Sequence, residues 1–129
     1  DLRQTLSAEG MDLVSLIAPT TADRRAREIA TTGSGFLYYV SLKGTTGSGA
    51  LAVDEVAERM SFLQTLTNVP ICVGFGIKDA KSAAAVGAHA DGVVVGSALV
   101  KLMADSPDPA TASQRLQTAI AEIRNGLDG

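Results

Sequence analysis

Two glycine-rich corners lie close together in the second half of the chain. The sequence GFG at residues 74–76 follows the apolar run PICV, and GS at residues 96–97 follows the run GVVV. Each corner opens into a stretch with the composition of a helix. Glycine lets backbone N–H groups approach an anion without a side chain in the way, and the first turn of a helix adds roughly half a positive charge. This combination is typical of phosphate binding.

The expected phosphate ligands are groups at four positions. Gly76 and Gly96 would stand at the carboxyl ends of neighbouring parallel strands, and Ser97 would add a hydroxyl and an N–H at a helix start. Gly47, in the loop after the preceding strand, could reach the same point. The alternative is that these glycines only form tight strand-to-helix turns. Two adjacent corners together with a helix start favour the phosphate site.

The rest of the chain alternates short apolar runs with amphipathic stretches. The apolar run at residues 13–19 predicts a strand buried on both faces, and apolar residues three and four apart predict helices. Strands are expected at residues 13–19, 36–41, 70–73 and 92–95, and helices at residues 2–9, 23–31, 54–66, 79–86, 97–103 and 110–127. Thr20 and Thr21 are expected to cap the second helix.

The predicted helix at residues 54–66 is amphipathic. Val56, Met60 and Leu63 share its apolar face, whereas Arg59 is expected to point into solvent. The preceding sequence, LKGTTGSGAL, has no apolar period and three glycines, which predicts a mobile loop.

Composition limits the class of protein. The chain has 129 residues, a size suited to one domain, and its 46% hydrophobic content is enough for a core. The net charge of -3 and an aromatic content of 4% argue against nucleic-acid binding. Cys72 lies inside an apolar run and is expected to be a buried strand thiol. No apolar run approaches a bilayer span and no signal peptide opens the sequence, so we expect a soluble cytoplasmic protein. The chain begins with Asp1 and reads as the middle of a longer protein.

Four strand–helix units in succession predict a parallel α/β sheet. An open flavodoxin-like sheet would suit the length. A (β/α)8 barrel needs roughly 250 residues and eight strands, so this chain would form about half of one. The two helices after the last strand favour the barrel, because such barrels often place a short helix there whose N-terminus receives phosphate. We therefore expect one domain over residues 1–129, built as a half barrel.

Four segments carry a family resemblance. LIAPTT, FLYYVSLKGTTG, VGFGI and GVVVGSALVK, in this order, resemble the carboxyl-terminal half of the tryptophan synthase α chain. The resemblance covers essentially the whole chain, and the Thr-Thr-Gly loop makes the set more specific than its single motifs. It implies a (β/α)8 TIM barrel of which this chain supplies roughly the last four units. It also implies cleavage of indole-3-glycerol phosphate to indole and glyceraldehyde 3-phosphate in tryptophan biosynthesis. The family's α chain uses no cofactor, and its partner is a β chain that uses pyridoxal phosphate.

By the same resemblance, single residues acquire roles. The four phosphate positions named above correspond to those that hold the substrate phosphate in the family. Ile17 and Phe75 correspond to apolar positions around the substrate pocket, and Tyr38 to a tyrosine near the reacting centre. Thr46 corresponds to the loop threonine that helps to fix a catalytic aspartate. Leu42 departs from the family, which often has a basic or small residue there.

The chain offers no complete acid–base site. The cleavage needs a proton delivered to an indole carbon and protons removed from the ring nitrogen and the side-chain hydroxyl, work that suits positioned carboxylates. The resemblance places the catalytic glutamate and aspartate on earlier strands, outside this chain. Tyr38 and Thr46 are therefore expected in supporting catalytic roles only. The other polar candidates are expected on a solvated face or at the opposite end of the barrel: Asp12, Asp54, Glu55, Glu58, His89 and Asp91.

Two interpretations of function remain. The favoured one is a lyase segment that holds the phosphate but is inactive alone. The alternative is a non-catalytic phosphate-binding half barrel, or half of another phosphate-handling barrel, such as an isomerase of the histidine or tryptophan pathways. Only the first explains the Thr45-Thr46-Gly47 loop. Open sheet edges at residues 13–18 and 92–95 predict pairing with the missing amino-terminal half or self-association.

Overall fold

The computed structural model is built on a four-stranded parallel sheet. The structure describes residues 1–41, 49–74 and 76–129. The strands are β1 (Ser15–Ile17), β2 (Leu37–Val40), β3 (Ile71–Gly74) and β4 (Gly92–Val94), and they pair in the order β1-β2-β3-β4. The predicted half barrel is confirmed, because each strand is followed by a helix and the sheet keeps the sequence order of its strands.

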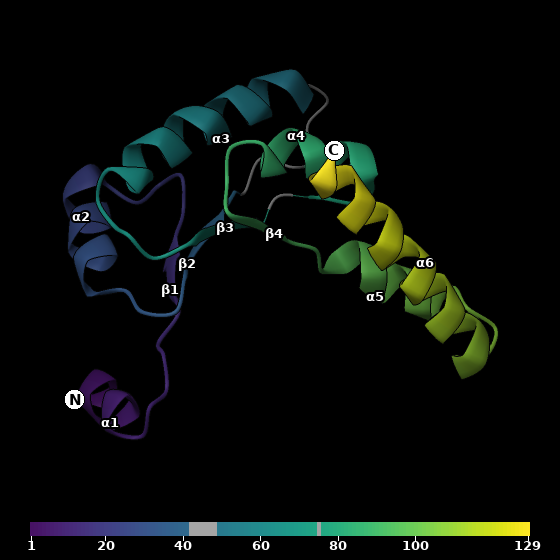
Figure 1. Cartoon of the computed structure of the whole chain (residues 1–129), viewed down its shortest axis with the longest axis horizontal. Coiled ribbons are helices and arrows are strands. Elements are labelled where there is room, and N and C mark those ends of the chain that lie inside the picture. The colour runs from purple at the N-terminus through teal and green to yellow at the C-terminus, as the bar shows by residue number, and fades with distance from the viewer. Residues whose placement is uncertain (42–48, 75) are drawn as a thin grey trace.

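Six helices accompany these strands in the described part of the chain. They are α1 (Leu2–Ala8), α2 (Asp23–Thr32), α3 (Gly49–Gln64), α4 (Ala80–Gly87), α5 (Ser97–Ala104) and α6 (Pro109–Asp128). Figure 1 shows the helices α2, α3, α4 and α6 arched over one side of the sheet, with α1 apart from it near the N-terminus. No described helix has the length and apolar character needed to cross a membrane.

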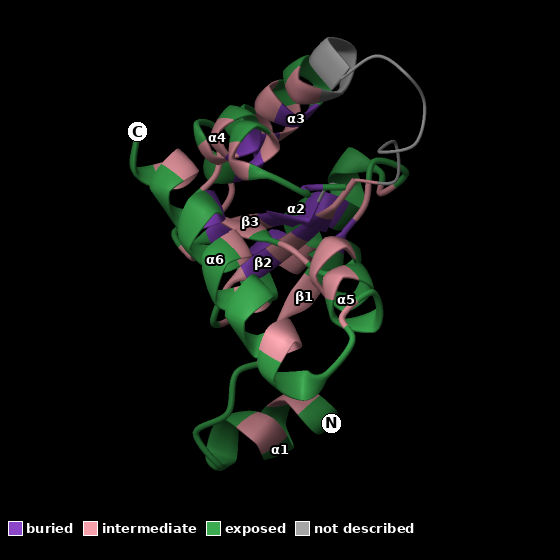
Figure 2. Ribbon diagram, turned by 90° about the vertical axis from the view of Figure 1, so that its right-hand side faces the viewer, coloured by how far each residue is buried: buried purple, intermediate pink, exposed green. Residues whose placement is uncertain are grey.

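The two faces of the sheet have different surroundings. Leu37, Tyr39 and Val73 point toward the helices and are almost fully buried. Their neighbours along the strands point to the other face, where Leu16 of β1 keeps 59% of its surface exposed and Val94 of β4 keeps 36%. The prediction that β1 is buried on both faces is therefore wrong, because nothing in the described residues covers the face that would line a barrel. Figure 2 shows the buried residues gathered between the sheet and the helices.

Cys72 lies on this open face and is only half-buried. Its register partners are Tyr38 of β2 and Gly92 of β4. Burial raises the pKa of the thiol above its ordinary value, and the nearby Asp91 carboxylate raises it further. The predicted strand position is correct, but the prediction of a buried thiol is not, since the open face leaves its side chain partly accessible.

The start of α2 also differs from its prediction. Ala22 occupies the cap position and makes no side-chain hydrogen bond to the helix. Thr21 Oγ1 instead accepts a hydrogen bond from the N–H of Ala18 at 3.0 Å, which closes the turn after β1. Threonine side chains stabilise such turns as well as helix starts, so the sequence alone could not decide whether Thr21 caps α2 or closes the turn after β1.

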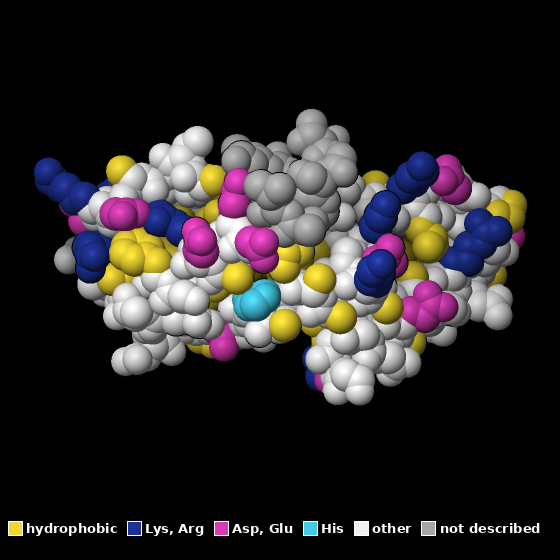
Figure 3. Space-filling model, turned by 90° about the horizontal axis from the view of Figure 1, so that it is seen from above, with side chains coloured by type: hydrophobic (Ala, Val, Ile, Leu, Met, Phe, Trp, Pro, Cys, Tyr) yellow, Lys and Arg dark blue, Asp and Glu magenta, His cyan; other side chains and the backbone are white. Residues whose placement is uncertain are grey.

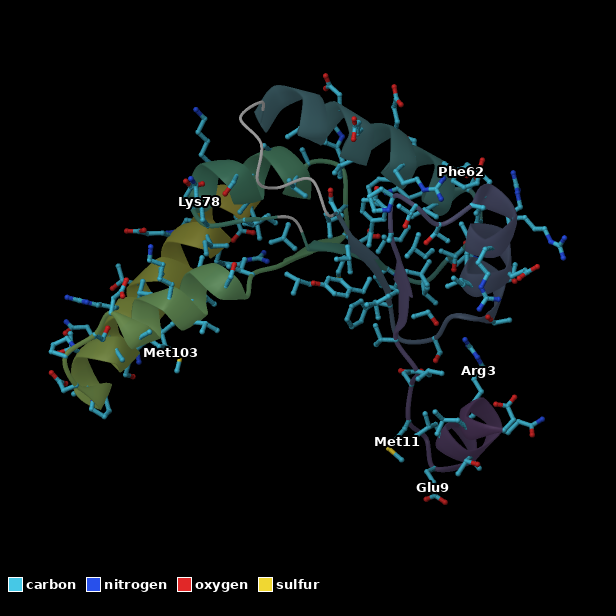
Figure 4. All side chains as sticks on the ribbon, turned by 180° about the vertical axis from the view of Figure 1, so that it is seen from behind. Arg3, Glu9, Met11, Phe62, Lys78 and Met103 are labelled. Atoms are coloured by element: carbon cyan, nitrogen blue, oxygen red, sulfur yellow. The ribbon has the colours of Figure 1, made fainter. Side chains whose placement is uncertain are left out.

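Helix α3 begins at Gly49 rather than at residue 54, and it buries the predicted Val56, Met60 and Leu63. Arg59 does not point into solvent as predicted, since its side chain is only 17% exposed. Its Nη1 donates to Asp23 Oδ1 at 2.6 Å, and its Nη2 donates to the carbonyl of Thr21 at 2.8 Å. Its guanidinium also lies 4.9 Å from the centre of the Phe62 ring, which Figure 4 shows between α2 and α3.

Candidate functional site

The two glycine corners lie side by side at the carboxyl edge of the sheet. Strands β3 and β4 are parallel neighbours, and their last residues, Gly74 and Val94, are register partners. The corner after β3 therefore opens next to the corner after β4. Gly76 is exposed and has a φ of +37°, a value that residues other than glycine rarely adopt.

The corner after β4 presents the start of α5. Gly96 is the cap residue of this helix, and its carbonyl accepts from the N–H groups of Leu99 at 3.0 Å and Val100 at 3.1 Å. The N–H groups at the very start of a helix have no carbonyl in a preceding turn to bond. Gly96 and Ser97 are exposed, and a Cβ built on Gly96 would meet nothing within 4 Å. Donors of a helix start thus face open space beside the first corner.

Tyr38 completes the described part of this edge. Its side chain points to the open face of the sheet and crosses the backbone of Gly74 on the neighbouring strand. A Cβ on Gly74 would collide with the Tyr38 hydroxyl and would lie 2.7 Å from its Cε2. Any side chain at position 74 would displace the ring, so the glycine that ends β3 is required by the tyrosine. The sequence places Gly74 in the glycine-rich corner but does not predict its contact with Tyr38, because the two residues lie far apart in the chain.

The other predicted site residues are placed differently. Ile17 is 1% exposed and belongs to the core between the sheet and the helices, so its side chain presents no surface to a ligand in this chain. Alternation along β1 turns Leu16, rather than Ile17, toward the open face. Four predicted positions lie outside the described residues, together with Thr45: Leu42, Thr46, Gly47 and Phe75.

Two carboxylates lie at the amino end of the sheet, whereas Asp23 and Asp79 stand at the carboxyl edge, where Arg59 and Ser82 engage them. Asp91 lies at the amino end of the sheet, where its Oδ2 accepts from the N–H of Ile71 at 2.8 Å. Asp12 lies at the same end, against Gly35. Both positions agree with the prediction that they belong to the opposite edge. The structure has no group of three or more potential metal ligands within the ranges it describes.

The remaining polar candidates are exposed. Asp54, Glu55 and Glu58 stand on the outer side of α3, and His89 lies in the turn before β4. Figure 3 shows acidic and basic side chains interspersed on the helix-covered side of the molecule. The prediction that Asp54, Glu55 and Glu58 lie on an exposed helix face is therefore correct, and so is the predicted turn position of His89.

Arg59 is a polar residue whose position was not predicted from the sequence. Its contacts with Asp23 and with the carbonyl of Thr21 tie α3 to the turn that follows β1, at the same edge as the glycine corners. Tyr39 lies close by, and burial raises the pKa of its hydroxyl, while the positive charge of Arg59 lowers that pKa. In the sequence, Arg59 is a single arginine beside apolar positions of an amphipathic helix. Such an arginine is more often exposed to solvent, so the sequence did not indicate its buried contacts.

Comparisons with known proteins agree with this geometry. The family model described as tryptophan synthase alpha chain matches residues 1–127. The tryptophan synthase alpha chain of Cupriavidus taiwanensis is 50% identical over 119 residues, which cover 92% of this chain and 44% of that protein. The one from Psychrobacter arcticus is 45% identical over 130 residues, covering 97% and 47%.

Solved structures give the same result. The alpha subunit of tryptophan synthase from Legionella pneumophila superposes with a TM-score of 0.82 at 30% identity, covering 98% of this chain and 46% of that one. The alpha subunit from Campylobacter jejuni gives a TM-score of 0.81 at 27% identity, covering 95% and 48%. The chain spans about half the length of the curated relatives it matches, and the match lies in their carboxyl-terminal half.

Proposed function

Because the chain belongs to the tryptophan synthase alpha chain family, we propose that it forms the phosphate-holding half of a carbon–carbon lyase. The reaction is cleavage of indole-3-glycerol phosphate to indole and glyceraldehyde 3-phosphate, in the cytoplasm and within tryptophan biosynthesis. The α chain needs no cofactor of its own, and the partner that takes the indole is a β chain with pyridoxal phosphate.

The observation that carries the proposal is the pair of bare corners at one edge of the sheet. Gly76 and Gly96 each lie two residues after the end of neighbouring parallel strands, and α5 begins directly at the second corner. A phosphate bound there would accept from backbone N–H groups, from the Ser97 hydroxyl and from the loop position Gly47. The partial positive charge of the helix start would stabilise the dianion. The Phe75 side chain would then border the apolar part of the substrate.

The chemical step needs groups that the described residues do not bring to this edge. General acids and bases contribute typically ~10²–10⁴-fold each to a rate. Asp12 and Asp91 lie at the opposite edge. Asp23 and Asp79 stand at this edge, but they are engaged at helix starts by Arg59 and by Ser82. Holding the phosphate stabilises substrate and transition state alike, so it does not by itself lower the chemical barrier. We assign Tyr38 and Thr46 supporting roles, and we propose that residues 1–129 alone do not cleave the substrate.

The test measures the binding of glycerol phosphate by calorimetry and by amide NMR. We expect wild type to bind and Gly96→Asp to lose binding, because the new carboxylate would stand where phosphate oxygens belong. Gly10→Asp is the matched control: it adds the same charge at an open glycine far from the site, with a φ of +68° that aspartate tolerates better than most residues. Equal affinity of wild type and Gly96→Asp would contradict the proposal.

A further inference from the structure

The turn after β1 lies at the carboxyl edge of the sheet and is closed by two hydrogen bonds. Thr21 Oγ1 accepts from the N–H of Ala18 at 3.0 Å, and the N–H of Thr21 donates to the carbonyl of Ala18 at 2.9 Å. Ile17, the last residue of β1, is the register partner of Tyr39 on β2. The turn therefore stands beside the end of β2, the strand that also carries Tyr38.

The same turn is held from the helix side by Arg59 of α3. Nη2 of Arg59 donates to the carbonyl of Thr21 at 2.8 Å, and Nη1 donates to the carboxylate of Asp23 at 2.6 Å. Thr21 belongs to the turn and Asp23 is the first residue of α2, so one guanidinium fixes both. Arginine presents its N–H groups in a rigid plane and can hold two acceptors in a set geometry, whereas lysine has a single ammonium on a flexible chain.

The burial of Arg59 indicates that its contacts serve geometry more than stability. Its side chain is only 17% exposed, and its guanidinium carbon lies 4.9 Å from the centre of the Phe62 ring (Figure 4). Among the described residues, no group accepts a hydrogen bond from its buried Nε. Buried ion pairs often stabilise a fold no better than apolar side chains of similar volume, and an unpaired buried donor costs free energy. An apolar side chain could fill this place, but it could not hold the carbonyl of Thr21.

We propose that Arg59 is a positioning residue for the lyase reaction, which acts by holding the turn after β1 in the wall of the barrel's mouth. The mouth is the opening at the carboxyl edge of the sheet, where the strand-to-helix loops of such barrels carry the reacting groups. This inference rests on the proposed function, because it assigns the turn to the same mouth as the glycine corners. It adds a residue of α3 that lies behind the mouth and acts through Thr21.

The strand order separates the turn from the phosphate site. In the order β1-β2-β3-β4, β2 lies between the turn after β1 and the corners after β3 and β4. The hydrogen bonds of Arg59 go to Thr21 and Asp23 and not to those corners. The corners would hold the phosphate, and the turn would border the rest of the substrate beside Tyr38. Arg59 should therefore influence the chemical step and not the affinity for phosphate.

The test uses the complete barrel, formed by this chain with the amino-terminal half of the Cupriavidus taiwanensis relative. Arg59→Lys keeps a positive charge beside Asp23 but loses the rigid pair of donors. Because a small displacement of a positioned group slows the chemical step, we expect kcat for indole release to fall about tenfold. KM and the affinity for glycerol phosphate should change less than about twofold, the pattern of an interaction that matters only in the transition state.

The matched control is Arg24→Lys. Arg24 also meets a carboxylate, that of Glu28 at 3.3 Å, but its side chain is 93% exposed on α2. This variant should leave kcat, KM and phosphate affinity unchanged. Urea unfolding of both variants compares their stability, because a merely structural role of Arg59 would lower the free energy of unfolding without a selective fall in kcat.

Amide hydrogen exchange measures the turn itself and does not depend on the reaction. The N–H groups of Ala18 and Thr21 close the turn, so their exchange should become faster on the order of tenfold in Arg59→Lys, while the amides of the strands keep their protection. Three outcomes would overturn the inference: an unchanged kcat in Arg59→Lys, an equal fall in kcat in Arg24→Lys, or a fall in kcat with both turn amides still protected.

Failure of the proposed function gives a different result. A wild-type barrel that binds no glycerol phosphate and releases no indole would overturn the proposed function, and with it the role of Arg59 in the reaction. Faster exchange of the two turn amides in Arg59→Lys would still show that Arg59 holds the turn. The two failures are therefore distinguished by comparing the phosphate titration of wild type with the exchange rates of the variant.

Discussion

The side chain of Tyr38 restricts which residue can occupy position 74 on the neighbouring strand. The two residues lie on neighbouring strands, and the ring of Tyr38 passes over the glycine backbone. This contact fixes the tyrosine beside the corner that leads to Gly76. Tyr38, which we propose supports the chemistry, therefore depends for its position on the glycine at the end of β3.

The contact predicts the outcome of a small substitution. Gly74→Ala would put a methyl group 2.7 Å from Cε2 of Tyr38, so we expect a loss of about 1–3 kcal/mol in the free energy of unfolding, the usual range for overpacking. Gly96→Ala is the control, because its methyl group would meet open space. Urea unfolding of both variants measures the difference. Equal stability of the two variants would show that Tyr38 moves aside freely.

At the scale of elements, the helices are held by capping residues at their starts and by the contacts of Arg59 between α2 and α3. Asp108 caps α6 through Thr111, with Pro109 in the first turn. Helices α2 and α3 are joined by Arg59, which reaches Asp23 while its guanidinium lies over Phe62. These contacts hold the helices that cover the sheet and keep the turn after β1 at the carboxyl edge.

The start of α4 makes stability depend on pH. Asp79 and Ser82 form a capping box, in which the Asp79 carboxylate accepts from the Ser82 N–H at 2.8 Å. Hydrogen bonds from the Ser82 hydroxyl and N–H hold the pKa of Asp79 below its ordinary 3.8. A depressed folded-state pKa contributes stability above the unfolded pKa, and this contribution is lost as pH falls through the folded value.

We therefore expect Asp79→Ala to lower the free energy of unfolding by about 1 kcal/mol at neutral pH, the usual cost of a lost cap. The difference from wild type should shrink as pH falls below about 4. Urea unfolding at neutral pH and at acid pH measures both values. Glu122→Ala, which removes an exposed carboxylate from α6, serves as the control. A cost for Asp79→Ala that stays constant down to acid pH would contradict the assignment.

At the scale of the whole molecule, the chain is an arch with a covered outer side and an open inner side. The outer side carries the helices and the mixed surface charges, and the inner side carries uncharged strands. A barrel has the same two sides, with helices around its outside and strands facing its interior, so the arch corresponds to about half of a barrel.

This arrangement predicts complementation. Residues 1–129 alone should release no detectable indole from indole-3-glycerol phosphate. Addition of a separately expressed amino-terminal half from a relative such as the Cupriavidus taiwanensis protein should restore indole release, because it would bring carboxylates to the mouth. Turnover by residues 1–129 alone would show that the acid–base groups lie within this chain.

The order of strands and helices could be predicted from local pattern. Apolar runs that end in glycine marked the carboxyl ends of β3 and β4, and helices such as α4 and α6 followed from their apolar spacing. Helix starts were harder to place, because Thr21 and Ala22 compete for a position that only the turn after β1 decides. The positions of Gly76, Gly96 and Ser97 at one edge followed from strand order alone.

Other features depended on contacts between residues distant in the chain. The direction of Arg59 is decided by Asp23 and Thr21, which reach it only when α2 and α3 are packed together. The burial of Ile17 and the exposure of Leu16 depend on which face of β1 the helices cover. Sequence determined that this chain builds parallel strands with bare glycine corners, since those signals are local. Only the tertiary structure decided which face stays open, because burial is set by neighbours that no local pattern specifies.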